Sequence, residues 1–328
     1  MNILELPFDQ YQRYKIAEEV INTLRNHENK VKILDVGGHP GLINEFLPED
    51  DTFVVDKLEC DIPNFQKVDI LELPFKDSSF DVVTSVDVLE HIPPEKREKF
   101  LAELWRVSKD CVLIAAPFDN PNVSLADRVL FEFIRVKLGY THHFLDEHIN
   151  NGLPNKNDTI NSLRKMGAYT FSIPNGNLSR WLPMMITLFY MDIDPKFNKL
   201  QKLINSFYNE NYYKIDNCEP CYRYAVVASK KELNELTVNK LQGLISLNNT
   251  NSYIDFSPVL GLIELFNLDM IKEKEEQINN LIEQLKENGK IVIPVGFQDD
   301  QDLILGCKGS GKGLITKQLI PVRFVSLK

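Results

Sequence analysis

The fold is decided by one stretch, Val31-Lys32-Ile33-Leu34-Asp35-Val36-Gly37-Gly38-His39-Pro40-Gly41. An apolar strand runs into an acidic residue and then into a glycine-rich turn. Glycines let the backbone approach a ligand closely, and a helix that begins after the turn presents free N–H groups. The stretch is therefore typical of a site for a nucleotide-like cofactor, although such turns also occur for packing alone.

The motifs that follow the turn extend this pattern. About twenty residues further on, Thr52-Phe53-Val54-Val55-Asp56 is a short apolar strand ending in a carboxylate, the position at which doubly wound sheets bind ribose hydroxyls. Three more motifs come next along the chain: Val68-Asp69-Ile70 with Leu73-Pro74-Phe75, then Ser79-Phe80-Asp81-Val82-Val83, then Leu89-Glu90-His91.

This ordered set resembles the class I S-adenosylmethionine-dependent methyltransferases, in particular the type 11 methyltransferase-domain group. The resemblance covers roughly residues 10–120 well and extends more loosely to about 231. It implies an α/β, Rossmann-like fold: a mostly parallel seven-stranded sheet with helices on both faces, and helical insertions at about 120–155 and 175–215. It also implies an enzyme with S-adenosyl-L-methionine as its cofactor, whose insertions cover the cofactor and shape the acceptor pocket.

The resemblance further implies which residues bind the cofactor. The turn would hold the methionine part, Asp56 the ribose, and Asp69 with the backbone of Ile70 the adenine. The predicted cofactor-binding residues are Asp35, Gly37, Gly38, His39, Gly41, Asp56, Asp69, Ile70 and Ser85. Turn or cap chemistry is the alternative role for the aspartates.

His39 and Pro40 depart from the family pattern, which usually has glycine and a small polar residue at these positions. A Cβ at His39 narrows the approach of the backbone, and Pro40 donates no N–H. We therefore expect either a shifted loop that still binds the cofactor, or weakened binding or loss of the site.

Composition narrows the possible partners of the 328-residue chain. Its net charge of −10 argues against nucleic acid as the main partner, because phosphate binding needs a cationic surface. The Met1 end does not read as a signal peptide, and the apolar stretch 181–191 is too short to span a bilayer. We expect a soluble, cytoplasmic protein without a membrane span.

Apolar periodicity predicts a first helix over 8–29, in which Ile16, Val20 and Leu24 fall four residues apart. The later predicted elements are strand 31–36, helix 41–47, strands 52–56, 66–69 and 81–86, helix 94–107, strand 110–116, helices 125–139 and 158–166, strand 168–173, a helical region 178–210 and strand 222–229. Strands that alternate with helices indicate a mostly parallel sheet.

The chain after this domain, predicted to span 1–231, divides into a linker at 232–257 and a helix with β-strands at 258–328. Residues 281–328 resemble the C-terminal segment of protein-L-isoaspartate O-methyltransferases, with Ile293-Pro294-Val295-Gly296 and a strand ending Phe324-Val325-Ser326-Leu327. The Ser/Thr active-site loop of that family has no counterpart here. We therefore interpret the segment as a structural extension whose strands either join the main sheet or form a small β subdomain.

Residues that follow strands at the carboxyl edge of the sheet are the candidates for acceptor chemistry. Asp87, Glu90 and His91 follow the fourth strand, and Thr141–His148 adds three histidines and two carboxylates. The second group could bind a metal or supply a base, but capping and a polar pocket wall explain it without a metal. We predict no metal site. The predicted catalytic residues are Asp87, His91, His143 and His148.

Other motifs have simpler explanations. The stretch 306–313 is close to a phosphate-binding loop, but Gly313 stands where Ser or Thr must hold magnesium, so a hairpin loop is expected. Cys218-Glu219-Pro220-Cys221 has metal or redox spacing without a second pair, and two reduced thiols are expected. The spacing of Ile271, Ile278 and Leu285 indicates a core-facing stripe more than a coiled coil.

Three functions compete at this point. The first is transfer of a methyl group to oxygen or nitrogen of a small-molecule, saccharide (glycan-type) or lipid-like acceptor. The second is repair of isoaspartyl protein, which rests on the C-terminal segment alone. The third is a binding module that has the fold but lacks catalysis because of His39 and Pro40.

Overall fold

The computed structural model describes residues 2–25 and 30–246, nine helical residues between 266 and 284, and the strands at 290–297, 300–308 and 314–322. The chain divides into two compact units, residues 1–262 and 263–328. The predicted domain boundaries at 231 and 257 remain predictions, because residues 247–265 lie outside the described residues.

A seven-stranded sheet forms the centre of the first unit, in the order β3-β2-β1-β4-β5-β7-β6. Its strands are β1 (Lys32–Val36), β2 (Asp51–Asp56), β3 (Phe65–Lys67), β4 (Phe80–Val86), β5 (Ser108–Pro117), β6 (Tyr169–Asn177) and β7 (Cys221–Ser229). Neighbouring strands are parallel except around β7, which runs antiparallel to β5 and β6. The predicted fold class is therefore confirmed: a mostly parallel, Rossmann-like methyltransferase fold.

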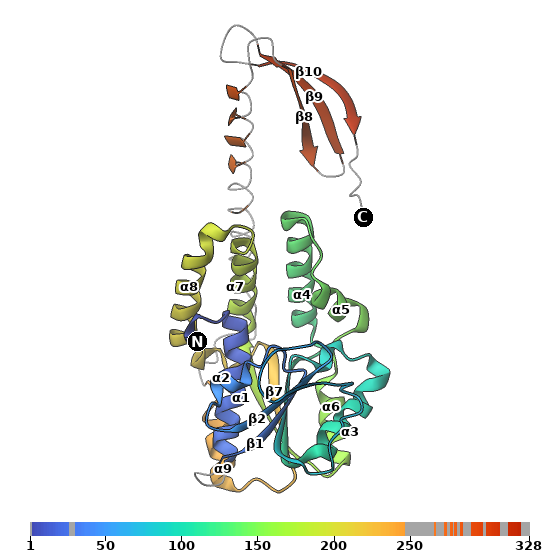
Figure 1. The fold of residues 1–328 in the computed structure, drawn as a ribbon, viewed down its shortest axis with the longest axis vertical. Coiled ribbons are helices and arrows are strands. Elements are labelled where there is room, and N and C mark those ends of the chain that lie inside the picture. The colour runs from blue at the N-terminus through green and yellow to red at the C-terminus, as the bar shows by residue number, and fades with distance from the viewer. Residues whose placement is uncertain are drawn as a thin grey trace. The chain divides into compact units, whose positions relative to one another are not determined.

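Helices cover both faces of this sheet, as predicted (Figure 1). One face packs on α1 (Phe8–Leu24), α2 (Ile43–Phe46) and α9 (Glu235–Gln242), and the other on α3 (Arg97–Val107) and α6 (Lys156–Lys165). The remaining helical segments are η1 (Ile3–Glu5), η2 (Leu89–His91), η3 (Pro94–Lys96), α4 (Pro121–Phe133), η4 (Ile134–Leu138), α5 (His143–Asn151), α7 (Leu178–Met191), η5 (Pro195–Phe197), α8 (Asn198–Asn211) and η6 (Lys214–Asp216).

Several predicted boundaries were wrong for local reasons. The helical region 178–210 is two helices, because Asp194 caps a new turn, η5, through a hydrogen bond to the N–H of Lys196. The helix expected from 125 begins at Pro121, after the Asn120 side chain accepts a hydrogen bond from the N–H of Asn122. The helix expected over 94–107 begins with the separate turn η3.

The sixth strand is longer than its predicted range of 168–173. It runs to Asn177, so Asn175-Gly176-Asn177 belongs to β6 instead of forming a turn after it. Gly176 has φ +75°, which supports this extension because glycine adopts positive φ without a steric penalty. The longer strand brings Asn175 opposite Arg223 of β7.

The second unit contains its own three-stranded antiparallel sheet, ordered β10-β9-β8. Its strands are β8 (Lys290–Phe297), β9 (Asp300–Lys308) and β10 (Leu314–Val322). Of the two expectations for these strands, the small β subdomain is the one observed. Gly306, Cys307 and Lys308 lie in β9, which supports the hairpin interpretation, whereas residues 309–313 and the stripe 271, 278 and 285 lie outside the described residues.

Among the residues that the structure describes, no helix combines the length and the apolar character needed to cross a bilayer.

Candidate cofactor and acceptor site

The glycine turn lies between β1 and α2, at the carboxyl edge of the sheet. Gly37 has φ +77° and Gly41 φ +89°, a backbone region that favours glycine. The N–H of Gly37 donates to the carbonyl of Val55 at 2.8 Å, which ties the turn to β2. A Cβ at Gly37 would lie 2.4 Å from a methyl of Val88, so the turn packs directly against the loop after β4.

Asp35 supports the turn from inside the protein. It is fully buried, and one carboxyl oxygen accepts a hydrogen bond of 2.7 Å from the Thr84 hydroxyl. The other oxygen, Oδ2, has no partner within the described protein, and a Cβ at Gly38 would come within 2.2 Å of it. Burial raises the pKa of Asp35 to about 7. The residue is thus a buried polar group that borders the turn and still has hydrogen-bonding capacity.

Asp56 ends β2 and fastens the next part of the turn. Its Oδ2 accepts a hydrogen bond from the N–H of His39 at 3.1 Å, and its Oδ1 accepts one from the N–H of Leu58 at 2.9 Å. His39 is itself exposed, and its peptide bond to Pro40 is cis. The turn thus accommodates His39, because its side chain lies at the surface and its backbone N–H is bound by Asp56.

The remaining predicted cofactor-binding residues differ in their exposure to solvent. Asp69 follows β3, is exposed, and accepts a hydrogen bond from the N–H of Leu71 at 2.9 Å. Ile70 beside it is half-buried. Ser85 is fully buried within β4, and its hydroxyl has no partner among the described residues. Their roles toward the cofactor remain predictions.

Two surface cavities lie away from this turn. One, of about 590 Å³, is lined by residues of α3 and α6, and the other, of about 80 Å³, lies between β5, α4 and β7. The argument for the cofactor site therefore rests on the turn itself, with its positive φ angles, its close packing and the unpaired oxygen of Asp35.

Asp87, one of the predicted catalytic residues, lies in a buried ion-pair network. It adopts φ +50°, and its carboxylate accepts hydrogen bonds from Arg13 at 2.7 Å and from two nitrogens of Arg223 at 2.9 and 3.1 Å. Arg223 is completely buried and also donates to Asp9 at 2.7 Å. The two guanidinium groups outweigh the effect of burial and lower the pKa of Asp87. The carboxylate therefore joins α1, β4 and β7.

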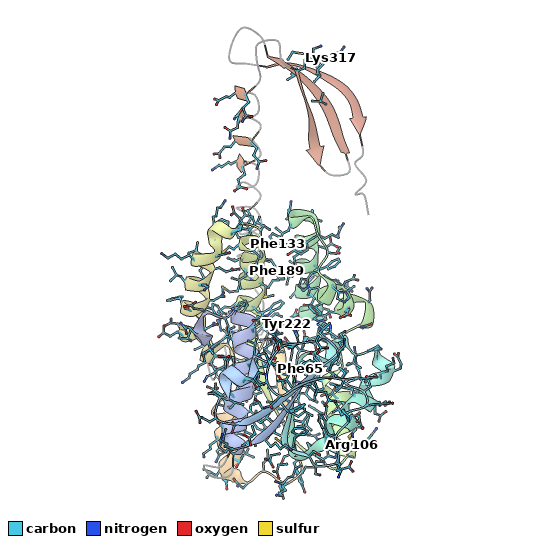
Figure 2. The ribbon with its side chains drawn as sticks, in the orientation of Figure 1. Phe65, Arg106, Phe133, Phe189, Tyr222 and Lys317 are labelled. Carbon is cyan, nitrogen blue, oxygen red and sulfur yellow. The ribbon has the colours of Figure 1, made fainter. Side chains whose placement is uncertain are left out.

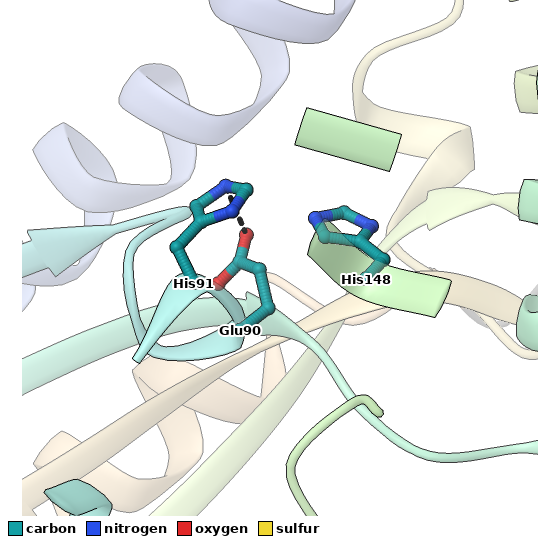
Figure 3. Close-up of side chains that lie close together, drawn as sticks. All are labelled: Glu90, His91 and His148. Carbon is teal, nitrogen blue, oxygen red and sulfur yellow. Dashed lines mark ion pairs between the residues drawn. The ribbon is translucent and has the colours of Figure 1, made fainter. Parts of the chain in front are cut away.

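Glu90, His91 and His148 meet beside this network, and Figure 3 shows the three side chains together. Glu90 is 1% exposed, and burial raises its pKa well above the usual range. Burial also lowers the pKa of His91 to about 4, so this imidazole is neutral at pH 7. His148 lies on α5, with its Nδ1 3.0 Å from Asp127. His91 and His148, which are far apart in sequence, thus lie in one cluster.

The other histidines of the 141–148 segment have local roles. His142 precedes α5 and accepts a hydrogen bond from the N–H of Leu145 at 3.4 Å, the capping expected from the sequence. His143 is 74% exposed and lies 3.3 Å from Glu147 one turn later, so the two side chains share one face of α5. The second oxygen of Glu147 lies 2.8 Å from Nδ1 of His91, but the two atoms are not in hydrogen-bond geometry.

Several important residues of this edge were missed in the sequence. Arg223 interrupts the apolar strand Tyr222–Ser229, and a lone arginine in a buried strand is itself a signal. Asp127 lies on the apolar face of α4, between Val123 and Leu130, and a buried acid there needs partners. The partners of Asp127 are His148 and the hydroxyl of Tyr222 at 2.9 Å. Tyr222 is labelled in Figure 2 and is 4% exposed.

Trp181 and the cysteine pair are part of the protein core. Trp181 is 2% exposed, stacks on Tyr222 at 3.5 Å between ring centroids, and donates from Nε1 to Asp9 at 2.7 Å. It is thus a core residue of the ion-pair network. Cys218 and Cys221 are buried free thiols, as expected from their isolated spacing.

Two segments of the chain match protein-family models. Residues 45–114 match the model described as "Methyltransferase domain", and residues 274–328 match that of protein-L-isoaspartate(D-aspartate) O-methyltransferase. Both predicted resemblances are confirmed for these segments. The chain is also 48% identical over 48 residues to protein-L-isoaspartate O-methyltransferase 1 of Polaromonas sp. (strain JS666 / ATCC BAA-500), which is 15% of this chain and 20% of that protein. The chain thus spans one fifth of the length of this curated relative.

Solved structures similar to this one include the YcgJ protein of Bacillus subtilis, with a TM-score of 0.40 and 14% identity over 66% of this chain and 100% of that chain. Another is magnesium protoporphyrin IX methyltransferase of Synechocystis PCC 6803 with bound SAH, with a TM-score of 0.41 and 12% identity over 68% of this chain and 84% of that chain.

Proposed function

We propose that this protein is an S-adenosylmethionine-dependent methyltransferase acting on oxygen or nitrogen of a small-molecule, saccharide or lipid-like acceptor. The observation that carries the proposal is the glycine turn after β1, with Gly37 and Gly41 at positive φ and the unpaired oxygen of Asp35 beneath it. The match of residues 45–114 to a methyltransferase-domain model supports it.

The residues present fit such a cofactor. The turn 37–41 would receive the amino-acid part, Asp56 the ribose and Asp69 the adenine, since each follows the carboxyl end of a successive strand. Asp56 lies close to the turn, and each of its oxygens can accept a further hydrogen bond. When bound, S-adenosylmethionine supplies a methyl group already activated on a sulfonium sulfur. The work left to the protein is to align the acceptor with that methyl group and to exclude water.

The acceptor side is formed by the predicted residues at the same edge. Asp87 is held by two arginines, so its contribution is to position β4 and the η2 loop. The histidines His91 and His148 lie beyond it, and the exposed His143 lies further out on α5. We assign acceptor binding to this group of histidines.

The helical insertions support an acceptor with apolar parts. Helices α4, α5, α7 and α8 gather at one end of the sheet (Figure 1), and several of their large apolar side chains are exposed. These are Leu125, Phe144, Ile149, Leu200, Leu203 and Phe207, with Val136 on η4. The net charge of −10 disfavours nucleic acid as the acceptor.

Calorimetry with S-adenosylmethionine and S-adenosylhomocysteine tests the proposal. We expect saturable binding of both, and crystals grown with S-adenosylhomocysteine should show its ribose at Asp56 and its amino-acid part over residues 37–41. The sulfur in those crystals then marks where the acceptor atom must lie. Absence of binding would leave the third function, a module with this fold but without catalysis.

Isoaspartyl repair is the second candidate, and the match over residues 274–328 favours it. An isoaspartyl-peptide methylation assay separates it from the first. Turnover of the peptide would favour repair, and cofactor binding without peptide turnover would favour another acceptor.

A further inference from the structure

Three side chains at the carboxyl edge of the sheet bring ligand atoms together in a way that their surroundings do not explain. Glu90 and His91 come from η2, directly after β4, and His148 comes from α5. One ligand atom from each lies within 4.8 Å of the others, and His91 Nε2 is 3.9 Å from Glu90 Oε1 (Figure 3).

Both imidazoles have a carboxylate close to Nδ1, in hydrogen-bond geometry at His148 and as a close approach only at His91. Nδ1 of His148 lies 3.0 Å from Asp127, and Nδ1 of His91 lies 2.8 Å from Glu147. A carboxylate at Nδ1 holds the proton on that nitrogen and leaves the lone pair on Nε2. Metal-binding histidines are supported in the same way, by a carboxylate or carbonyl at the nitrogen that does not bind the metal.

Two atoms of these side chains are buried without a partner among the described residues, and one of them, Nε2 of His148, lies toward the other two side chains, whereas the Glu90 oxygen nearest His91 is Oε1. Glu90 is 1% exposed, and its Oε2 has no hydrogen bond among the described residues. His148 is 8% exposed, and the same holds for its Nε2. Leaving a buried polar atom unpaired is unfavourable, so the unpaired Nε2 of His148 beside Glu90 and His91 indicates a missing ligand.

The local charge balance favours a cation. The network beside the site is balanced, with two arginines against two aspartates: Arg13, Arg223, Asp9 and Asp87. Of the other charged groups that the described chain places around the site, Glu90, Glu147 and Asp127 carry carboxyl groups, whereas Arg97 is a cation that donates to backbone carbonyls. Carboxyl groups therefore exceed cations around the two histidines.

We propose that Glu90, His91 and His148 form a binding site for one divalent transition-metal cation, with Asp127 and Glu147 orienting the two imidazoles. Two imidazoles and one carboxylate suit zinc and its first-row neighbours, and three protein ligands leave a coordination position open. Two atoms bound to one ion at about 2.1 Å lie at most about 4.2 Å apart. A pair of ligand atoms 4.8 Å apart must therefore close in by at least about 0.6 Å when the ion binds.

The position of the site suggests its use. Val88, two residues before Glu90, packs against Gly37 of the cofactor turn. A cation here would bind an acceptor oxygen and lower the pKa of its hydroxyl, so His91 and His148 act as ligands instead of free bases. This use rests on the proposed function, whereas binding of the metal does not.

Titration of the full-length protein with Co²⁺ alone, followed by visible absorption, tests the site without any cofactor. We expect one equivalent to bind, with Glu90→Gln and His148→Gln each weakening binding by more than about 100-fold, beyond the loss typical of second-sphere changes. Glu132→Gln, at a carboxylate on α4 that is 54% exposed and pairs with Arg135, is the matched control and should bind Co²⁺ as the parent does. Absence of binding to the parent, or equal affinity in all three variants, would overturn the proposal.

Because a buried variant can fail to fold, a second measurement uses the unmodified protein. X-ray absorption at the cobalt edge should show two imidazole nitrogens among the ligands, and a sphere with one or none would refute the site. Calorimetry with S-adenosylhomocysteine is carried out separately without metal, so failure of the cofactor proposal and failure of the metal proposal give different results.

Discussion

Gly37 shows how a single position shapes the cofactor turn. It combines φ +77° with close packing, because an added Cβ would lie 2.4 Å from a methyl of Val88, a stiff β-branched side chain. The presence of a glycine in the sequence does not by itself reveal the contact with Val88. The turn is therefore specified by the pairing of Gly37 with the loop after β4.

Gly37→Ala should lower the free energy of unfolding more than Gly139→Ala. Both positions have positive φ, which costs roughly 1–2 kcal/mol for alanine, but Gly139 has open space around its Cβ position. The steric clash at Gly37 adds about 1–3 kcal/mol. Urea unfolding of the two variants measures the difference, and equal losses would mean that Val88 does not constrain the turn.

Asp56→Ala should weaken S-adenosylhomocysteine binding by about 10–100-fold, the value of hydrogen bonds to a charged group. Asp51→Ala is the matched control, since Asp51 begins the same strand and its side chain is 70% exposed. Calorimetry gives both affinities, with thermal unfolding to verify that the variants are folded. Unchanged affinity in Asp56→Ala would contradict the role predicted for the end of β2.

Because burial raises the pKa of Asp35, we expect the free energy of unfolding to depend on pH. Its pKa rises from 3.8 to about 7 on folding, mainly because of burial, so at intermediate pH the folded state holds a proton that the unfolded state has lost. The free energy of unfolding should therefore fall as pH rises from about 4 to about 7, by a total on the order of 4 kcal/mol from this group.

Asp35→Asn should remove this part of the slope. Urea unfolding of the parent and the variant between about pH 4 and pH 7 measures it, because other titrating groups contribute equally to both proteins. Parallel pH profiles would show that Asp35 is ionised in the folded protein.

At the scale of elements, the network of Asp87 and Arg223 joins segments that are distant in sequence. Arg223→Met should lower the free energy of unfolding by about 3 kcal/mol, because the partly buried carboxylates of Asp87 and Asp9 would be left with fewer partners. Arg135→Met is the control: its side chain is 51% exposed beside Glu132, and a surface pair contributes at most about 1 kcal/mol. Similar losses in urea unfolding would show that the network adds no stability.

The sequence predicted most of the sheet and the turn, because these depend on local patterns. Short apolar runs located β1, β2, β4 and β5 to within a few residues, and the glycine spacing located the turn. Element ends were harder where a side-chain cap decides them, as at Asn120 and Asp194. The extension of β6 depends on pairing with β7, which no local pattern contains.

The candidate site was predictable only in part, for the same reason. Asp35, Asp56 and the glycines form their contacts near in sequence or on adjacent strands. The partners of the acceptor side lie far apart: Tyr222 and Asp127 are separated by 95 residues, and Arg223 and Asp87 by 136. Pairings at such distances depend on the tertiary fold, so the role of Asp127 at His148 was missed.

For the molecule as a whole, the two units form separate sheets. The seven-stranded sheet is complete within residues 1–262, and β8, β9 and β10 pair with one another. A chain that ends at residue 262 should therefore unfold at the same urea concentration as the full chain and bind S-adenosylhomocysteine with the same affinity. A large loss of either would show that the second unit contributes to the first.

The position of Arg223 also has a consequence for synthesis on the ribosome. Asp9 and Asp87 emerge early, but the guanidinium that bridges them is encoded 136 residues after Asp87. At about 5–20 residues per second, that interval is on the order of ten seconds. Until nearly all of the first unit has been translated, Arg13 is therefore the only one of the two arginines of this network that the nascent chain can offer to Asp9 and Asp87.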